Sequence, residues 1–392
     1  MRIFFPFCCM LMSSCCSAVT QLNVWHMLKE MDADFIATTA AFSKANPDIK
    51  VSVYLLPNEE LKASAIRAVE QNVAPDVIII SSDNVGYAHL MKLSALPADM
   101  IDTAMPAADA QALAFNDTHY SIPLFTGNHL LMLYNKALVK TPATDWQQLS
   151  LQQPGFEQQG VHTLALNFQE PYWFALIASL FDAELTQDGK VSLNTAPMQQ
   201  ALQFYRHLSQ SGLANMHCSY RCVSDDFYQG RYAYAVNGVW ALASARAQMG
   251  DNLGVMLFPQ LQQRFIKPLS SYIVMIFPNN SLRSAKAKQI KQLVAFMRQP
   301  QNLQPLAQKH FLAPYYLADP MQLKPADPIY AAVLAQSRLS QLMPASTAMV
   351  SVWNGLHKGL LLYLNNTLDA AAATELMQKV ATRDQHLLEA GL

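Results

Sequence analysis

A regular alternation of strand and helix patterns near the N-terminus places the strongest constraint on the fold. Strand-like segments at 22–25, 49–55 and 77–80 are separated by helical spacing at 32–45 and 59–71. The third strand is a continuous run of β-branched residues, which is typical of a parallel strand covered on both faces. This order predicts an α/β fold with right-handed crossovers.

The same alternation resumes further along the chain. A buried strand is predicted at 130–136, helices at 198–210 and 285–297, and a mostly helical segment from residue 329 onward. The chain has 392 residues, which is enough for two domains with a large buried core. No low-complexity linker interrupts it, so composition alone does not mark a domain boundary.

Composition excludes several classes of protein. Hydrophobic residues make up 52% of the chain and charged residues only 14%. After the N-terminal leader, however, no segment offers about 18 uninterrupted apolar residues, so we do not expect a membrane-spanning body. The formal net charge is −1, which gives no indication of a nucleic-acid partner or a polybasic membrane patch.

The N-terminus has the pattern of an export signal. Arg2 precedes an apolar run at 3–12, and small residues at 13–18 suit a cleavage site. We expect a periplasmic protein that is cleaved after Ala18. The alternative is a weak lipobox that ends at Cys15 and would place a lipid on that residue.

Only two of the six cysteines, Cys218 and Cys222, lie outside this leader. An exported protein with one even pair is expected to form a disulfide where geometry permits. A four-residue separation permits it in a turn, and the bond would then fix Tyr220, which lies between the two cysteines. The alternative is a pair of reduced thiols in a helix.

The sequence offers little for catalysis. It has no Gly-rich phosphate loop, no Gly-x-Ser-x-Gly elbow and no His-Glu-x-x-His, and its ten histidines are scattered. We therefore expect no enzyme activity, no bound metal and no cofactor. A glycoside hydrolase needs two carboxylates; Glu170 with Asp83 or Asp225 would supply them, but nothing in the sequence pairs them.

The segment 166–173 is chemically the richest in the chain. It holds Glu170, Tyr172 and Trp173 within a few residues of an asparagine and a glutamine. Aromatic faces cover the apolar C–H face of a pyranose, while acids and amides bind its hydroxyls. Two further segments add to this pattern: Asn237-Gly238-Val239-Trp240, and Met343-Pro344 with Trp353 ten residues beyond the methionine.

The order and spacing of these three segments resemble the maltose-binding family of periplasmic solute-binding proteins for carbohydrate importers. The resemblance implies a two-lobe type II binding-protein fold, with discontinuous lobes, hinge crossings and a ligand cleft between the lobes. It spans nearly the whole chain after the leader. The implied lobes are 19–126 with 272–314 and 130–268 with 318–392, and the implied hinges lie near 126–128, 269–271 and 314–317.

The resemblance also implies roles for individual residues. Glu170 is expected to hydrogen-bond sugar hydroxyls, with Tyr172 beside it and Trp173 where the family has phenylalanine. Trp240 and Trp353 are each expected to stack on a sugar ring. Tyr220, ten residues before a glycine, and Asp83, after the strand at 77–80, match further ligand-contacting positions.

Several positions depart from the family pattern. Lys29 followed by Glu30 reverses the acid-then-lysine order after the first strand. Asn84 stands in place of an arginine, Ile80 in place of a tryptophan, and His357 in place of a helix arginine. The stacking residues of the second lobe therefore match the family, while the hydroxyl-binding residues of the first lobe differ. We expect a glucan-type oligosaccharide, which need not be maltose.

Each position also has a purely structural alternative. Trp240 and Trp353 would serve equally as core tryptophans, and Tyr172 with Trp173 as packing at a helix start. Glu170 and Asp83 would serve as helix caps. The joint pattern is harder to explain in this way than any single residue.

Taken together, the sequence predicts a monomeric binding protein that captures a di- or oligosaccharide by hinge closure and delivers it to an inner-membrane ATP-driven importer. Three alternatives stay open: a binder of glycerol-phosphate diesters, a sensory protein that presents its closed form to a chemoreceptor or kinase, and a glycoside hydrolase. A phosphate ligand would need basic groups, and Asn84 lacks the charge of the arginine it replaces.

Overall fold

The computed structural model describes residues 19–315 and 327–391. Its main sheet is mixed and has the strand order β2-β1-β3-β12-β6-β10-β7. The strands of this path are β1 (Thr20–His26), β2 (Ile49–Leu55), β3 (Val77–Ser81), β6 (Ser121–Asn135), β7 (His162–Ala165), β10 (Tyr232–Gly238) and β12 (Leu269–Ile276).

The first half of the sheet matches the predicted alternation closely. Strand β1 lies parallel to β2 and β3, and α1 (Asp32–Ala45) and α2 (Asn58–Glu70) connect these strands. All residues of β3 are buried, as its continuous β-branched sequence predicts. Helix α1 places Phe35, Thr39 and Phe42 in the core, because these residues share one helical face.

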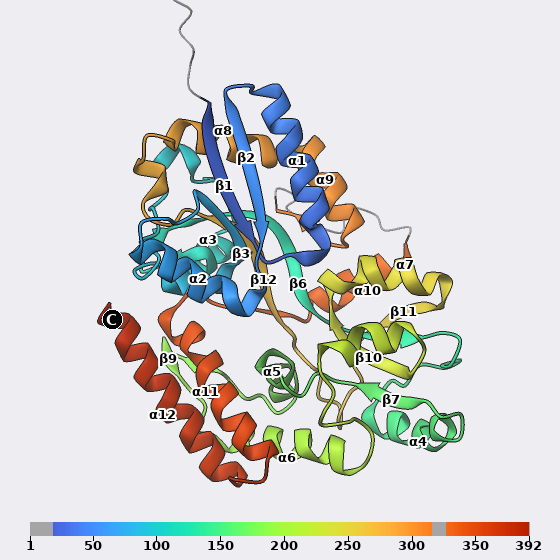
Figure 1. The fold of residues 1–392 in the computed structure, drawn as a ribbon. Helices are drawn as coiled ribbons and strands as arrows, with labels where there is room; N and C mark the ends of the chain where they lie inside the picture. Colours follow the sequence, from blue (N-terminus) through green and yellow to red (C-terminus); the bar gives the residue numbers. More distant parts are fainter. Residues whose placement is uncertain (1–18, 316–326, 392) are drawn as a thin grey trace, which may run out of the picture.

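Strand β6 is the element that joins the two halves. Along Ser121 to His129 it pairs with β12, whereas from Leu130 to Tyr134 it pairs with β10. Figure 1 shows β6 and β12 running from the half that contains β1 and α1 into the half that contains α5 and β10. The predicted strand at 130–136 is therefore the second part of a longer strand that serves both halves.

Short strands complete the junction. β13 (Ala313–Pro314) pairs with β6, β14 (Gln341–Leu342) pairs with the start of β12, and β11 (Leu253–Met256) pairs with the end of β6. The remaining helices of seven or more residues are α3 (Ala107–Leu113), α4 (Trp146–Glu157), α5 (Pro171–Ser179), α6 (Ala196–Gln210), α7 (Leu242–Met249), α8 (Ala287–Met297), α9 (Pro300–Lys309), α10 (Pro328–Ser337), α11 (Thr347–Leu364) and α12 (Ala370–Glu389).

The C-terminal helices α11 and α12 pack closely along one another (Figure 1). Glycines make this approach feasible: a Cβ atom on Gly355 would lie 2.5 Å from the Met377 carbonyl oxygen, and one on Gly359 would lie 2.8 Å from that of Ala373. Helix α11 carries Trp353, so this packing fixes the position of that indole. Within the described parts of the chain, no helix has the length and apolar character needed to cross a membrane.

Candidate functional site

Five aromatic side chains from distant segments meet at the junction of the two halves. Tyr172 and Trp173 come from the first turn of α5, Tyr220 from the start of a helical turn, Trp240 from the short helix η5 (Val239–Ala241) and Trp353 from α11. The Tyr172 ring centroid is 6.2 Å from that of Trp173, 6.3 Å from Trp240 and 5.9 Å from Trp353. Trp173 lies 6.2 Å from Trp240 and 6.3 Å from Tyr220. We call these five residues the aromatic cluster.

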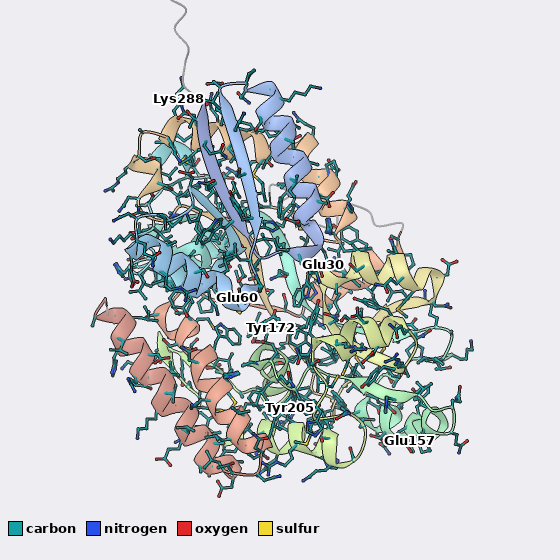
Figure 2. All side chains as sticks on the ribbon, in the orientation of Figure 1. Glu30, Glu60, Glu157, Tyr172, Tyr205 and Lys288 are labelled. Carbon is teal, nitrogen blue, oxygen red and sulfur yellow. The ribbon has the colours of Figure 1, made fainter. Side chains whose placement is uncertain are left out.

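Tyr172 is the centre of the aromatic cluster. Pro171 begins α5 directly after the loop that follows β7, and this start aims Tyr172 at the junction. Its hydroxyl donates to the Leu269 carbonyl at 2.6 Å, so it bonds to the first residue of β12. Figure 2 labels Tyr172 between the two halves, with Glu30 on the opposite side of the junction.

Trp173 and Trp240 differ in exposure. Trp173 is only 4% exposed, and its indole Nε1 donates to the Val236 carbonyl at 2.8 Å. Trp240 is half-buried and donates through Nε1 to the Tyr220 hydroxyl at 3.1 Å. Trp173 thus forms the rear wall of the aromatic cluster, while Trp240, Trp353 and Tyr220 retain exposed ring surface.

Asp83 and Asn84 approach the aromatic cluster from the first half. Both lie on η2 (Ser82–Tyr87), directly after β3, and are 6% and 3% exposed. Asp83 Oδ2 accepts from Trp353 Nε1 at 3.4 Å. The Asn84 amide nitrogen donates to Ser81 Oγ at 2.9 Å, and Asn84 Oδ1 has no hydrogen-bond partner among the described residues. Neither Asp83 nor Glu170 makes the helix-capping hydrogen bond considered above as a structural alternative.

Glu30 and Lys29 lie on η1 (Lys29–Met31), after β1. Burial raises the pKa of the Glu30 carboxyl above its usual range, against the opposing effect of neighbouring Lys29. Burial, and next the charge of Glu30, raise the pKa of the Tyr220 phenol to about 12. With lysine before glutamate, the Glu30 carboxyl is partly buried near Tyr220, whereas the Lys29 side chain is exposed.

Glu170 and His357 lie at the edges of this arrangement. Glu170 is the residue immediately before α5 and is partly buried. Burial raises the pKa of the Tyr205 phenol, and the nearby Cys218 and Glu170 add to this rise. His357 is exposed on α11, one turn after Trp353. The structure thus brings the carboxylates of Glu30 and Asp83 to the aromatic cluster, with Glu170 beside it.

The predicted disulfide is not present in the structure, where Cys218 and Cys222 are both free. The expected open turn is a helical segment that contains a π-helical turn at Cys222–Asp226. The Cys218 thiol donates weakly to the Ser219 carbonyl at 3.8 Å. Burial raises the pKa of the Cys218 thiol, which favours its protonated form.

Two further residues support the site: Asn237, which the sequence analysis named only as part of a motif, and Tyr228, which it did not name. Asn237 is fully buried, and its amide donates to the Val223 carbonyl at 2.8 Å while its Oδ1 accepts from Gly238. It therefore fixes the turn that presents Trp240. The Tyr228 hydroxyl donates to the Ala241 carbonyl at 3.5 Å, and burial raises the pKa of its phenol. The aromatic pair Phe227-Tyr228 was the available signal for the second residue.

A separate cavity of about 320 Å³ lies at the β7 edge, lined by residues that include His162, Met216, His217 and Tyr232. It shares no lining residue with the aromatic cluster. Among residues 19–315 and 327–391, no group of three His, Cys, Asp or Glu side chains is arranged to hold a metal ion. The aromatic cluster offers ring faces for stacking, and Asp83 offers a hydrogen-bond acceptor beside them.

Comparison with known proteins agrees with this geometry. A family model described as "Bacterial extracellular solute-binding protein" matches residues 37–319. Among solved structures, the chain is similar to the maltose/maltodextrin-binding domain MalE from Bdellovibrio bacteriovorus bound to maltotriose, with a TM-score of 0.83 and 22% sequence identity. That match covers 94% of this chain and 100% of the other. It confirms the predicted two-lobe type II fold, and both comparisons are with binding proteins rather than enzymes.

Proposed function

The chain belongs to the family of bacterial extracellular solute-binding proteins, and from this premise we propose that it captures a di- or oligosaccharide and delivers it to an inner-membrane ATP-driven importer. The observation that carries the proposal is the aromatic cluster, with buried Asp83 and partly buried Glu30 facing it from the other half of the molecule. Ring faces for stacking and carboxylates for hydroxyl groups are the two components of a carbohydrate site.

The proposed mechanism is closure of the two halves over the sugar. Trp240, Trp353 and Glu170 would contact the ligand from one side, and Asp83 and Glu30 from the other. A ligand held by both halves favours the closed arrangement, because its affinity for that arrangement is higher. The maltotriose bound to the similar MalE domain supports this choice of ligand class.

The change of partners along β6 supports the proposed lobes. β6 exchanges β12 for β10 at His129 and Leu130, within two residues of the proposed hinge at 126–128. Leu269 and Ser270, in the second proposed hinge, pair with β14. We propose lobes of 19–126 with 272–314 and 130–268 with 318–392; the third hinge, 314–317, extends beyond the described residues.

The partner and location follow from the family. Membership in an extracellular family implies export. We propose that the leader is cleaved after Ala18, with lipidation of Cys15 as the alternative; both positions lie outside the described residues. The closed form would be recognised by the importer permease, and recognition by a chemoreceptor is the sensory alternative.

A thermal-shift screen tests the proposal. The purified protein is heated with a panel of neutral disaccharides, maltodextrins and a glycerol-phosphate diester. A ligand at about 100 times its Kd stabilises the folded state by ~2.7 kcal/mol, which gives a clear shift in Tm. Stabilisation by a saccharide without turnover supports the proposal. Stabilisation by the phosphate diester alone would overturn it.

A further inference from the structure

The residues around the aromatic cluster carry an excess of negative charge. Asp83 approaches the rings of Trp353 and Tyr172, and its charge adds to burial in raising the pKa of the Tyr172 phenol. The charge of Glu30 likewise adds to burial in raising the pKa of the Tyr220 phenol. Asp83 is thus buried against the Trp353 indole, whereas Glu30 is only partly buried near Tyr220.

Few cationic groups balance these carboxylates. None of the ion pairs between described residues involves Asp83 or Glu30. Lys29 lies beside Glu30 but is exposed, and Arg221 forms its ion pair with Asp226. A buried carboxylate without a cationic partner is costly unless other donors satisfy it.

The side-chain oxygens of Asp83 and Asn84 receive few hydrogen bonds. The contacts of the Asp83 carboxylate with Trp353 Nε1 and the Asn84 amide nitrogen are long, at 3.4 and 3.5 Å. The Asn84 side chain is buried, with only 3% of its surface exposed. Its Oδ1 has no hydrogen-bond partner among the described residues. Two buried acceptor groups therefore lie side by side where a ligand rich in donors would satisfy them.

We propose that the captured carbohydrate is an amino sugar whose protonated amino group lies between Asp83 and Asn84, against the rings of Trp353 and Tyr172. An ammonium group supplies three donors and no acceptor. It neutralises the Asp83 charge, and aromatic rings attract it through cation–π interaction. This inference rests on the proposed carbohydrate function and narrows its substrate class.

Isothermal titration with matched ligands tests the inference. The β-1,4-linked glucosamine dimer, its N-acetylated form and cellobiose share one linkage and differ at the 2-substituent. Maltose serves as a neutral α-linked sugar and spermidine as a cation without a sugar. At a pH below the pKa of the sugar amine, the glucosamine dimer should bind about ten- to a hundredfold more tightly than cellobiose and the N-acetylated dimer.

Two variants test whether the Asp83 carboxylate is responsible for the preference. Asp83→Asn removes the charge with little change of shape and should abolish the preference for the amino sugar. Glu157→Gln removes one carboxylate from α4, far from Tyr172 in Figure 2, and should leave the preference unchanged.

The remaining outcomes are distinct. If cellobiose or maltose binds as tightly as the glucosamine dimer, the amino-sugar inference fails while the carbohydrate function stands. If only spermidine binds, or if none of the five compounds binds, the amino-sugar inference fails, and the thermal-shift panel with its maltodextrins decides the carbohydrate function separately. A preference that persists in Asp83→Asn would also overturn the assignment of the ammonium site.

Discussion

The Trp353 indole donates to the Asp83 carboxylate at 3.4 Å, although 270 residues separate the two positions in the chain. Asp83 follows β3 in the first half of the sheet, whereas Trp353 belongs to α11, which packs on α12. This contact joins the two halves at the aromatic cluster. A ligand that binds Asp83 would therefore lie beside the Trp353 indole, since the carboxylate can accept further hydrogen bonds.

Trp240→Ala and Trp353→Ala should each weaken carbohydrate binding by more than ~1.5 kcal/mol and leave the fold intact. Both indoles are half-buried and retain ring surface for stacking. The Tm of the unliganded protein and the sugar affinity are to be measured on the same variants. A core tryptophan behaves differently, because its truncation costs about 3–5 kcal/mol of stability with or without ligand. Loss of stability with normal binding would assign both residues to the core.

Trp173→Phe should change stability more than affinity. The Trp173 indole lies behind the aromatic cluster and bonds to the Val236 carbonyl at 2.8 Å. Phenylalanine keeps the aromatic wall but leaves that carbonyl without its donor, at a cost of about 1–3 kcal/mol. Chemical denaturation and sugar titration of this variant separate the two effects. A large loss of affinity with unchanged stability would instead indicate direct ligand contact by the indole.

Gly238→Ala should displace Trp240. A Cβ atom on Gly238 would lie 2.2 Å from the Trp240 ring, so the indole must move. We expect weaker sugar binding and a changed tryptophan fluorescence spectrum. Gly155→Ala is the matched control, since nothing lies within 4 Å of its Cβ, and it should stabilise α4 by about 0.4–1 kcal/mol. Equal sugar affinity in both variants would contradict this account of Trp240.

Local patterns predicted the elements of the first half well. The predicted helix at 32–45 and strand at 49–55 have the same bounds as α1 and β2. Their side-chain periodicity and the Asn46-Pro47 break are both contained within a few residues of sequence. In such segments, short-range preferences and tertiary packing favour the same structure.

The contacts of the site were harder to predict. The Tyr172 hydroxyl bonds to the Leu269 carbonyl, 97 residues away, and no local spacing encodes a side-chain to backbone bond across that distance. For Cys218 and Cys222 the structure has the alternative, two reduced thiols in a helical segment, and not the disulfide, because a four-residue spacing suits a helix as well as a turn. The resemblance supplied the positions of the aromatic residues but not their mutual contacts.

The export prediction concerns residues outside the described ranges. Protein recovered from its native envelope should begin at Val19, or at a lipid-modified Cys15, because an apolar run and small residues precede these positions. Mass spectrometry of the intact protein distinguishes the two starts. A chain that begins at Met1 in a cytoplasmic fraction would contradict both.

The last prediction concerns acid stability and His129, a fully buried residue where β6 changes partners. Burial lowers the pKa of its imidazole from 6.5 to about 4, against the opposing effect of a bond to the Gly127 carbonyl. Between these two values the unfolded chain binds a proton that the folded chain does not. The free energy of unfolding should therefore fall as pH decreases from 6.5 to about 4, by at most about 3 kcal/mol for this residue.

Denaturant unfolding across this range should show a shallower pH dependence for His129→Gln than for the native protein. His217→Gln, at an exposed position, is the control and should retain the native slope. If His129→Gln also retains it, the loss of stability in acid arises from other groups.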